Sequence, residues 1–310
     1  MDIFRGSNAC RLLSGDAAHG RLAHAYLLVC PDGRNLRTFL KELAVIASGA
    51  DERAARLIRE ERYQDCRVFP AEGGKATVAD VKELLEECYV KPTESDRKLF
   101  VIDRVQEMLP SAQNKLLKVL EEPPQGVCFL LGTESEFPVL PTVLSRVRKL
   151  ELLSFPEEEI EKYLRKKYPR RGDLAAIAAL SGGVLGRAEE YAEGGSVSEK
   201  NGEIALLLLS LSPASVPQAA RRFGEKGETA EFLRGLRLVC RDLLMFRLGR
   251  KELMRSGADI RVMERAAARY SEAALVRAQT CVGEAERDLK FNANAVSCIE
   301  KLLDGILEEG

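Results

Sequence analysis

The chain has 310 residues, of which 45% are hydrophobic and 31% charged, so it is long enough for about two domains, or three small ones, with buried cores. Lys and Arg number 47 and Asp and Glu 48, and the resulting net charge of -1 excludes a globally basic surface for nucleic acid, although a local basic patch fits it. The longest nearly unbroken apolar run, residues 204–211, is far shorter than the ~20 residues that span a bilayer. The first residues also lack the basic-then-apolar layout of a signal peptide, so we expect a soluble, cytoplasmic protein.

The eight cysteines, at positions 10, 30, 66, 88, 128, 240, 281 and 298, are scattered along the chain without the short Cys-x-x-Cys spacing of zinc sites. Cys10, His19, His24 and Cys30 could in principle converge, but Cys30 ends an apolar run typical of a buried strand. We therefore expect small, buried, reduced thiols and no metal site.

Short β-rich runs alternate with helical stretches in the first half of the chain. Most of these runs are continuously apolar, as strands covered on both faces tend to be, and they span residues 26–30, 66–69, 99–102, 127–131 and 150–153. Between them, Thr77 is expected to cap a helix with Asp80 three residues on, and Ser111 to cap another helix that stops at Pro123. This alternation predicts a parallel α/β sheet.

After about residue 154 the strand signals fade and only helical patterns remain. Pro156 and three glutamates open a helix that ends in a basic run, residues 165–167, and a Gly-Gly-Ser stretch at 194–196 is typical of a hinge. Thr229 and Ser271 are expected to cap later helices, and the last helix to span residues 294–307. The fold class is therefore α/β plus all-α, with an α/β domain over 1–153, a small helical domain over 154–195 and a helical C-terminal domain over 196–310.

The loop after the first predicted strand occupies the place where an α/β nucleotide-binding domain carries its phosphate loop, G-x-x-x-x-G-K-[ST]. In that pattern the glycines let backbone N–H groups wrap the phosphates, the lysine bridges the β- and γ-phosphates, and the hydroxyl holds magnesium. Here the defining positions hold Cys30, Asn35, Leu36 and Arg37, while Gly33 lies between them. Leucine removes the cation, and an arginine cannot replace the magnesium-binding hydroxyl, so the loop is degenerate.

The acidic motif at the end of the third predicted strand is degenerate too. An active ATPase of this class normally follows the aspartate with a glutamate that polarises the attacking water, but here Arg104 follows Asp103. Two independent losses point the same way, so we expect no ATP hydrolysis by this chain, and neither a nucleotide cofactor nor a metal in its own site.

Four stretches of the sequence resemble a known family. They are residues 20–27 (G-R-L-A-H-A-Y-L), residues 114–124 (N-K-L-L-K-V-L-E-E-P-P), Leu144-Ser145-Arg146 and Asn292-Ala293-Asn294. Together they resemble the bacterial clamp-loader subunits of the AAA+ class, and the similarity covers nearly the whole chain. A degenerate phosphate loop beside a retained Ser-Arg pair is most similar to the delta-prime subunits of DNA polymerase III.

The resemblance implies an AAA+ architecture, with a five-stranded parallel sheet, a helical lid and a C-terminal collar that mediates oligomerisation. It implies one position in a hetero-pentameric ring with the clamp-loader ATPase subunits and the delta subunit, which loads the sliding clamp onto primed DNA. Such a chain is not an enzyme by itself but is part of the DNA-directed DNA polymerase holoenzyme, whose polymerase site lies in another chain.

The resemblance also implies that Arg146, next to Ser145, acts as an arginine finger in the ATP site of the neighbouring subunit. A guanidinium delivered across an interface neutralises charge that develops on the γ-phosphate. The plainer interpretation is an ordinary cation at the start of a strand, close to Arg148 and Lys149.

Two features depart from the family pattern. The family's Ser-Arg-Cys is Ser145-Arg146-Val147 here, a change between apolar residues of similar size that we expect to repack without moving Arg146. Many relatives also carry a four-cysteine zinc module between the first helix and the second strand, but residues 44–65 contain no cysteine. Zinc is therefore not expected.

Three motifs keep more than one interpretation. Gly186-Arg187 stands where AAA+ proteins place a nucleotide-sensing arginine, and with a degenerate loop we favour a structural contact. The basic run at 165–171 suits DNA phosphates but also a solvated helix end, which we favour. Glu121 and Glu122 lie at the C-terminal end of a helix, where the dipole disfavours acids, and local propensity does not explain them.

Two other functions compete with the non-catalytic clamp-loader subunit. One is an AAA+ clamp-loader ATPase of the gamma/tau type with an unconventional nucleotide site, which micromolar ATP binding by the isolated chain would favour. The other is a stand-alone DNA-binding protein, against which the near-neutral charge argues.

Overall fold

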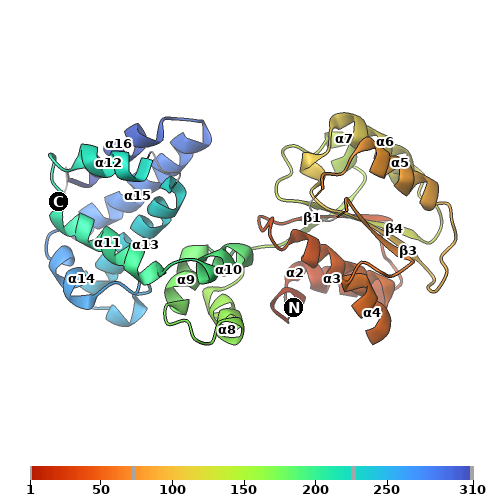
Figure 1. Cartoon of the computed structure of the whole chain (residues 1–310), viewed down its shortest axis with the longest axis horizontal. Coiled ribbons are helices and arrows are strands. Elements are labelled where there is room, and N and C mark those ends of the chain that lie inside the picture. The colour runs from red at the N-terminus through yellow and green to blue at the C-terminus, as the bar shows by residue number, and fades with distance from the viewer. Residues whose placement is uncertain (1, 72–73, 225–227, 308–310) are drawn as a thin grey trace. The chain divides into compact units, whose positions relative to one another are not determined.

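The computed structural model describes residues 2–71, 74–224 and 228–307 (Figure 1). The chain divides into two compact units. The sheet unit comprises Met1–Phe155 together with Val184–Arg187, and the helical unit comprises Pro156–Gly183 and Ala188–Gly310.

The sheet unit is built on a five-stranded sheet with the order β2-β3-β4-β1-β5, in which each pair of neighbouring strands is parallel. The strands are β1 (Ala25–Val29), β2 (Cys66–Phe69), β3 (Lys98–Ile102), β4 (Val127–Thr133) and β5 (Arg148–Glu151). The predicted parallel sheet is thus confirmed. The predicted fifth strand, 150–153, starts too late, because pairing with β1 already begins at Arg148, whose exposed side chain hides the strand from an apolar pattern.

Helices cover both faces of this sheet, with α2, α3 and α4 on one side and α5, α6 and α7 on the other (Figure 1). The elements are α1 (Asp2–Arg5), α2 (Asn8–Ala18), α3 (Leu36–Ser48), α4 (Glu52–Arg59), α5 (Val78–Glu87), the 3-10 turn η1 (Val105–Glu107), α6 (Pro110–Glu121) and α7 (Pro141–Leu144). Strands β1, β3 and β4 are almost entirely buried between these layers, as their continuous apolar runs predict.

The helix starts in the sheet unit follow local chemistry. Thr77 and Asp80 form the predicted capping box at α5, each side chain accepting the other residue's backbone N–H. The predicted cap at Ser111 is wrong, because α6 begins one residue earlier at Pro110, with Leu109 at the N-cap position. Proline suits the first helical position because its missing N–H needs no partner there.

The helical unit contains α8 (Glu157–Lys167), α9 (Leu174–Ser181), most of α10 (Leu185–Glu193), α11 (Val197–Ser210), α12 (Val216–Gly224), α13 (Thr229–Arg247), the 3-10 turn η2 (Lys251–Leu253), α14 (Ile260–Ala267), α15 (Glu272–Lys290) and α16 (Ala295–Leu307). Only the first turn of α10 groups with the sheet unit. The division of the chain into domains 1–153, 154–195 and 196–310 stays a prediction.

The apolar face of α13 is buried inside the helical unit. Leu236, Val239 and Leu243 are all 0% exposed and belong to one continuous core with α11, α12, α14, α15 and α16. Ser271 caps α15 as predicted. Thr229 is the first residue of α13 rather than its cap, because its hydroxyl donates to the carbonyl of Phe223.

The basic run at 165–171 makes contacts within the helical unit. Arg165 pairs with Glu161, and Lys167 pairs with the buried carboxylate of Glu189. Arg171 pairs with Asp173 at 2.7 Å and donates to backbone carbonyls from Tyr191 to Gly195, so it also fastens the predicted hinge. These contacts favour a structural role for the run.

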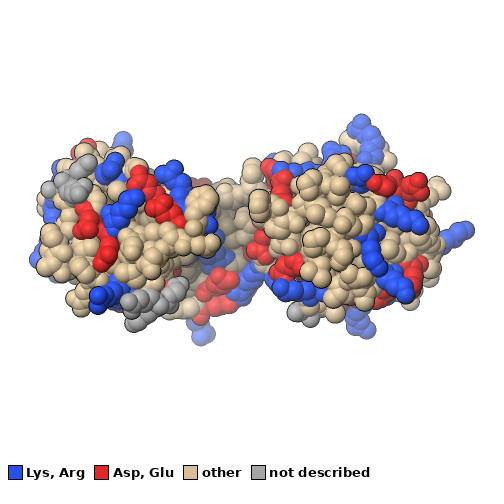
Figure 2. All heavy atoms as spheres, turned by 90° about the horizontal axis from the view of Figure 1, so that it is seen from above, with Lys and Arg blue, Asp and Glu red and all other residues tan. Residues whose placement is uncertain are grey.

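All eight cysteines are buried free thiols, as predicted. Among the helices of the described residues, none combines the length and apolarity needed to cross a bilayer. On the face shown in Figure 2, acidic and basic side chains are interspersed on each unit, as a net charge of -1 suggests.

A buried carboxylate, Asp65, ties the start of β2 to the loop before β3. Its oxygens accept hydrogen bonds from the backbone N–H groups of Thr93, Glu94 and Ser95, at 2.7–2.8 Å, and from the Ser95 hydroxyl. Burial acts to raise the pKa of Asp65, but these donors outweigh it and hold the pKa below its usual value.

We predict that Asp65→Asn lowers the free energy of unfolding by about 2–4 kcal/mol at neutral pH, since it removes the charge that several donors face. Because the folded-state pKa is depressed, this contribution is present above the unfolded pKa of about 3.9 and is lost as the pH falls through the folded value. Urea unfolding of both proteins at a series of pH values would measure it. The difference in the free energy of unfolding between wild type and variant should narrow as the pH falls. The exposed Asp96→Asn on the same loop serves as control. An unchanged urea midpoint for Asp65→Asn at neutral pH would contradict the stabilising role of Asp65.

Candidate functional site

The candidate site lies at the carboxyl edge of the sheet, where a parallel α/β fold binds its ligands. Strands β1, β4 and β3 are neighbours in the sheet. The degenerate loop therefore follows one strand while Glu134 and Asp103 follow the next two. The structure thus brings the predicted loop and the predicted acidic motif together.

The carboxylate of Asp32 occupies the centre of the degenerate loop. Asp32 is 4% exposed, and its Oδ1 accepts the backbone N–H of Asn35 at 3.1 Å. Its Oδ2 accepts the Asn35 side-chain amide at 3.1 Å and the backbone N–H of Gly186 at 2.7 Å. Asn35 precedes the first residue of α3 and Gly186 lies in the first turn of α10, so the carboxylate sits at two helix N-termini. A helix N-terminus is where a bound phosphate would normally lie.

Two glycines allow this close packing of acidic groups. A Cβ atom at Gly186 would lie 2.2 Å from Oδ1 of Asp32, and one at Gly33 would lie 2.5 Å from Oε1 of Glu134. The loop is therefore covered by a second carboxylate as well as filled by the first. A polyphosphate entering here would meet two negative groups and would have to displace one of them.

The residues at the other defining positions of the loop are buried or paired within the chain. Leu36 and Cys30 are both 0% exposed, and burial raises the pKa of the Cys30 thiol to about 12. Arg37 donates to both carboxylate oxygens of Glu61, at 2.7 and 2.5 Å, and to the carbonyl of Pro70 at 2.8 Å. Burial acts to raise the pKa of Glu61, and the partners Arg37 and Lys41 hold it below its usual value. Arg37 is thus part of an ion pair on the sheet unit.

The residues of the acidic motif, Asp103 and Arg104, also make contacts within the fold. Arg104 donates from Nη2 to the carbonyl of Gly33 at 3.2 Å and lies 3.7 Å from the carboxylate of Glu107. Asp103 is 8% exposed, and burial raises its pKa, partly offset by Arg104 and Arg37. Arg104 therefore closes the degenerate loop in the position where an ATPase of this class carries its glutamate.

Arg146 lies in the chain between α7 and β5. Its Nη1 donates to the carbonyl of Thr142 at 2.8 Å and to the hydroxyl of Ser145 at 3.0 Å. Its Nη2 lies 2.6 Å from a carboxylate oxygen of Glu121, the last residue of α6. The side chain stays 32% exposed, so the guanidinium is oriented by three contacts yet open to solvent.

The backbone that carries Arg146 is fixed from below by Gln113, a buried residue of α6 that is 1% exposed. Its amide oxygen accepts the N–H of Leu140 at 2.9 Å, directly before α7, and its amide nitrogen donates to the carbonyl of Pro138. Val147 is partly buried and packs against the same core. Gln113 thus ties α6 to the backbone directly before α7.

A family model described as "DNA polymerase III, delta subunit" matches residues 6–156. The delta' subunit of DNA polymerase III from Bacillus subtilis is 24% identical over 97% of this chain and 95% of its own length. The gamma subunit from Buchnera aphidicola is 30% identical over 53% of this chain, and the match spans 48% of that protein.

The chain belongs to the DNA polymerase III delta-prime and clamp-loader family. The chain spans about half the length of that gamma subunit and nearly all of the delta' subunit. Superposition on a gamma-subunit-related protein of Thermotoga maritima gives a TM-score of 0.42 at 17% identity, covering 96% of this chain and 97% of that one.

Sequence reasoning did not find the contacts that three acidic residues make here: Asp32, Glu134 and Glu121. Only Glu121 carried a signal, since an acid at the C-terminal end of a helix is unfavourable without a partner. Asp32 had no signal at all, because the pattern of a phosphate loop leaves its position open. In the part of the chain that the structure describes, no group of three or more His, Cys, Asp or Glu side chains is placed to hold a metal.

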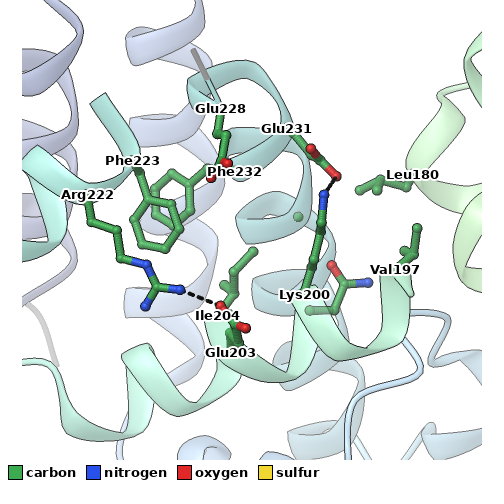
Figure 3. A pocket seen from close by; sticks show the side chains of 12 residues that line it. Leu180, Val197, Lys200, Glu203, Ile204, Arg222, Phe223, Glu228, Glu231 and Phe232 are labelled. Atoms are coloured by element: carbon green, nitrogen blue, oxygen red, sulfur yellow. Dashed lines mark hydrogen bonds and ion pairs between the residues drawn. The ribbon is translucent and has the colours of Figure 1, made fainter. Parts of the chain in front are cut away.

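A separate hollow of about 290 Å³ lies in the helical unit between α11, α12 and α13 (Figure 3). Its rim is tied by two ion pairs, Lys200 with Glu231 at 2.8 Å and Arg222 with Glu203 at 2.5 Å. Phe223 and Phe232 stack at its base with ring centres 4.0 Å apart.

We predict that Asp32→Ala lowers the free energy of unfolding by about 2–4 kcal/mol, because it leaves buried N–H groups without their charged acceptor. Sulfate ions can accept the same hydrogen bonds and should recover part of the loss. Thermal unfolding with and without sulfate at constant ionic strength measures both effects. Sulfate should raise the midpoint of the variant more than that of the wild type, and equal shifts would mean that Asp32 is not replacing an anion.

Proposed function

We propose that this chain is a non-catalytic, cytoplasmic delta-prime-like subunit of the DNA polymerase III clamp loader. It supports ATP-driven loading of the sliding clamp onto primed DNA during replication, and it supplies Arg146, seated beside Ser145, as an arginine finger to the ATP site of a neighbouring subunit. Its partners are the clamp-loader ATPase subunits and the delta subunit in a hetero-pentameric ring, and through them the clamp and DNA.

The observation that carries the proposal is the Asp32 carboxylate in the place of a phosphate. The N–H groups of Asn35 and Gly186, which would otherwise be available to a nucleotide, already bind a group of this chain. A subunit whose own loop is filled can serve an ATPase only by what it presents to another subunit's site.

The placement of Arg146 supports the second half of the proposal. A guanidinium carries five N–H donors in a planar fork, and three contacts to Thr142, Ser145 and Glu121 leave donors on it for an anion. Its 32% exposure makes it accessible from outside the chain. The nearby Arg148 and Lys149 are paired instead with Asp16 at 2.7 Å and with Glu136 and Glu151.

One alternative has support of its own. The match to the gamma subunit of Buchnera aphidicola, at 30% identity over 53% of this chain, favours a gamma/tau-like ATPase subunit with an unconventional nucleotide site. That function requires Asp32 to leave the loop when ATP enters.

We predict that Arg146→Ala lowers the DNA-stimulated ATP turnover of a reconstituted clamp loader. An arginine finger is worth about 10³–10⁵ in rate at the site that it serves, but the loss for the whole loader should be partial because its other sites keep their own partners. Steady-state hydrolysis with saturating clamp and primed DNA measures it.

The control is Arg148→Ala, since Arg148 lies two positions away and pairs with Asp16. Size exclusion should show that both variants assemble as the wild type does. Unchanged turnover in an intact Arg146→Ala loader would reduce the chain to a scaffold and contradict the finger.

A further inference from the structure

Local structure does not explain why position 121, within the 114–124 stretch, is a glutamate. It is the last residue of α6, at the negative end of the helix dipole, and its side chain is 50% exposed. Neither helix propensity nor burial in a core accounts for an acid at this position.

The structure supplies a partner, Arg146, at 2.6 Å. The two residues are 25 positions apart (146 − 121) and reach each other because α7 packs beside α6. The C-terminal end of α6 itself favours a cation, so the carboxylate and the helix end attract the guanidinium in the same direction. The pair thus sets the direction of the Arg146 side chain from outside its own loop.

The two contacts within the Arg146 loop leave that direction open. Thr142 and Ser145 both bind Nη1, so one end of the guanidinium fork is held. Nη2 is held by Glu121 alone among the ion pairs and hydrogen bonds of the described residues. Without Glu121, the planar group could swing about its Nη1 contacts.

We propose that Glu121 is a positioning residue for Arg146: its carboxylate holds Nη2 so that the remaining donors of the guanidinium face outward in a fixed orientation. This inference rests on the function proposed above, because the orientation matters only if Arg146 meets an anion of another subunit. An arginine that is already oriented loses less rotamer freedom when it binds an anion, and a misdirected arginine lowers the rate of the reaction that it assists.

The exposure of the Glu121–Arg146 pair allows Glu121 to be substituted with little effect on folding. An ion pair with both side chains partly exposed contributes little to folding, so variants of Glu121 should keep their structure. The neighbouring Glu122 is exposed and has the same side chain, which provides a matched control one position away.

The experiment compares reconstituted clamp loaders carrying Glu121→Ala, Glu121→Gln, Glu122→Ala, Arg146→Ala or the double variant Glu121→Ala with Arg146→Ala. We expect Glu121→Ala to lower kcat for ATP by up to about tenfold at the site served by Arg146, with KM nearly unchanged. Glu121→Gln, which keeps an acceptor without the charge, should fall between Glu121→Ala and the wild type. Glu122→Ala should match the wild type.

The double variant separates positioning from a general structural effect. If Glu121 acts through Arg146, the double variant has the turnover of Arg146→Ala alone, because two groups that act as a unit are not additive. Additive losses, wild-type turnover in Glu121→Ala, or faster turnover would each overturn the inference while Arg146→Ala still shows its loss. If Arg146→Ala itself has wild-type turnover, the proposed function fails first and this inference fails with it.

Discussion

The conformation of the degenerate loop depends on one interaction, the burial of the Asp32 carboxylate against the N–H groups of Asn35 and Gly186. A carboxylate that is 4% exposed is costly to bury unless donors meet it, and here two helix N-termini do so. The loop therefore holds its shape with an anion of its own. Because the second donor comes from the first turn of α10, the same contact also fastens residues 184–187 to the sheet unit.

The residues of the degenerate loop make their contacts within the fold. The positions at which an ATPase of this class binds nucleotide make contacts within this chain instead. Leu36 is buried in the core, Arg37 pairs with Glu61, and Arg104 donates to the carbonyl of Gly33. Arg146, by contrast, stands on a support fixed by Gln113 and remains partly open to solvent. The contrast between these arginines is the basis for proposing that the chain assists a neighbour's site.

Much of this could be predicted from sequence, and the failures have physical causes. Continuous apolar runs identified the strands because the sheet is buried on both faces, whereas the exposed edge strand β5 was placed too late. The loss of the phosphate loop was visible at four defining positions, yet Asp32 was not, because its role depends on Gly186, 154 positions later in the chain. The predicted cap at Ser111 lies two residues after the N-cap Leu109, and the predicted cap at Thr229 lies one residue after the N-cap Glu228, because Pro110 and the carbonyl of Phe223 set the helix starts.

The most direct test of this account is calorimetric titration of the isolated chain with ATP and magnesium. If the Asp32 carboxylate holds the place of the phosphates, no saturable binding should be found even at millimolar ATP. Saturable binding at micromolar ATP would contradict the account, since it requires Asp32 to leave the loop, and it would favour the gamma/tau-like alternative.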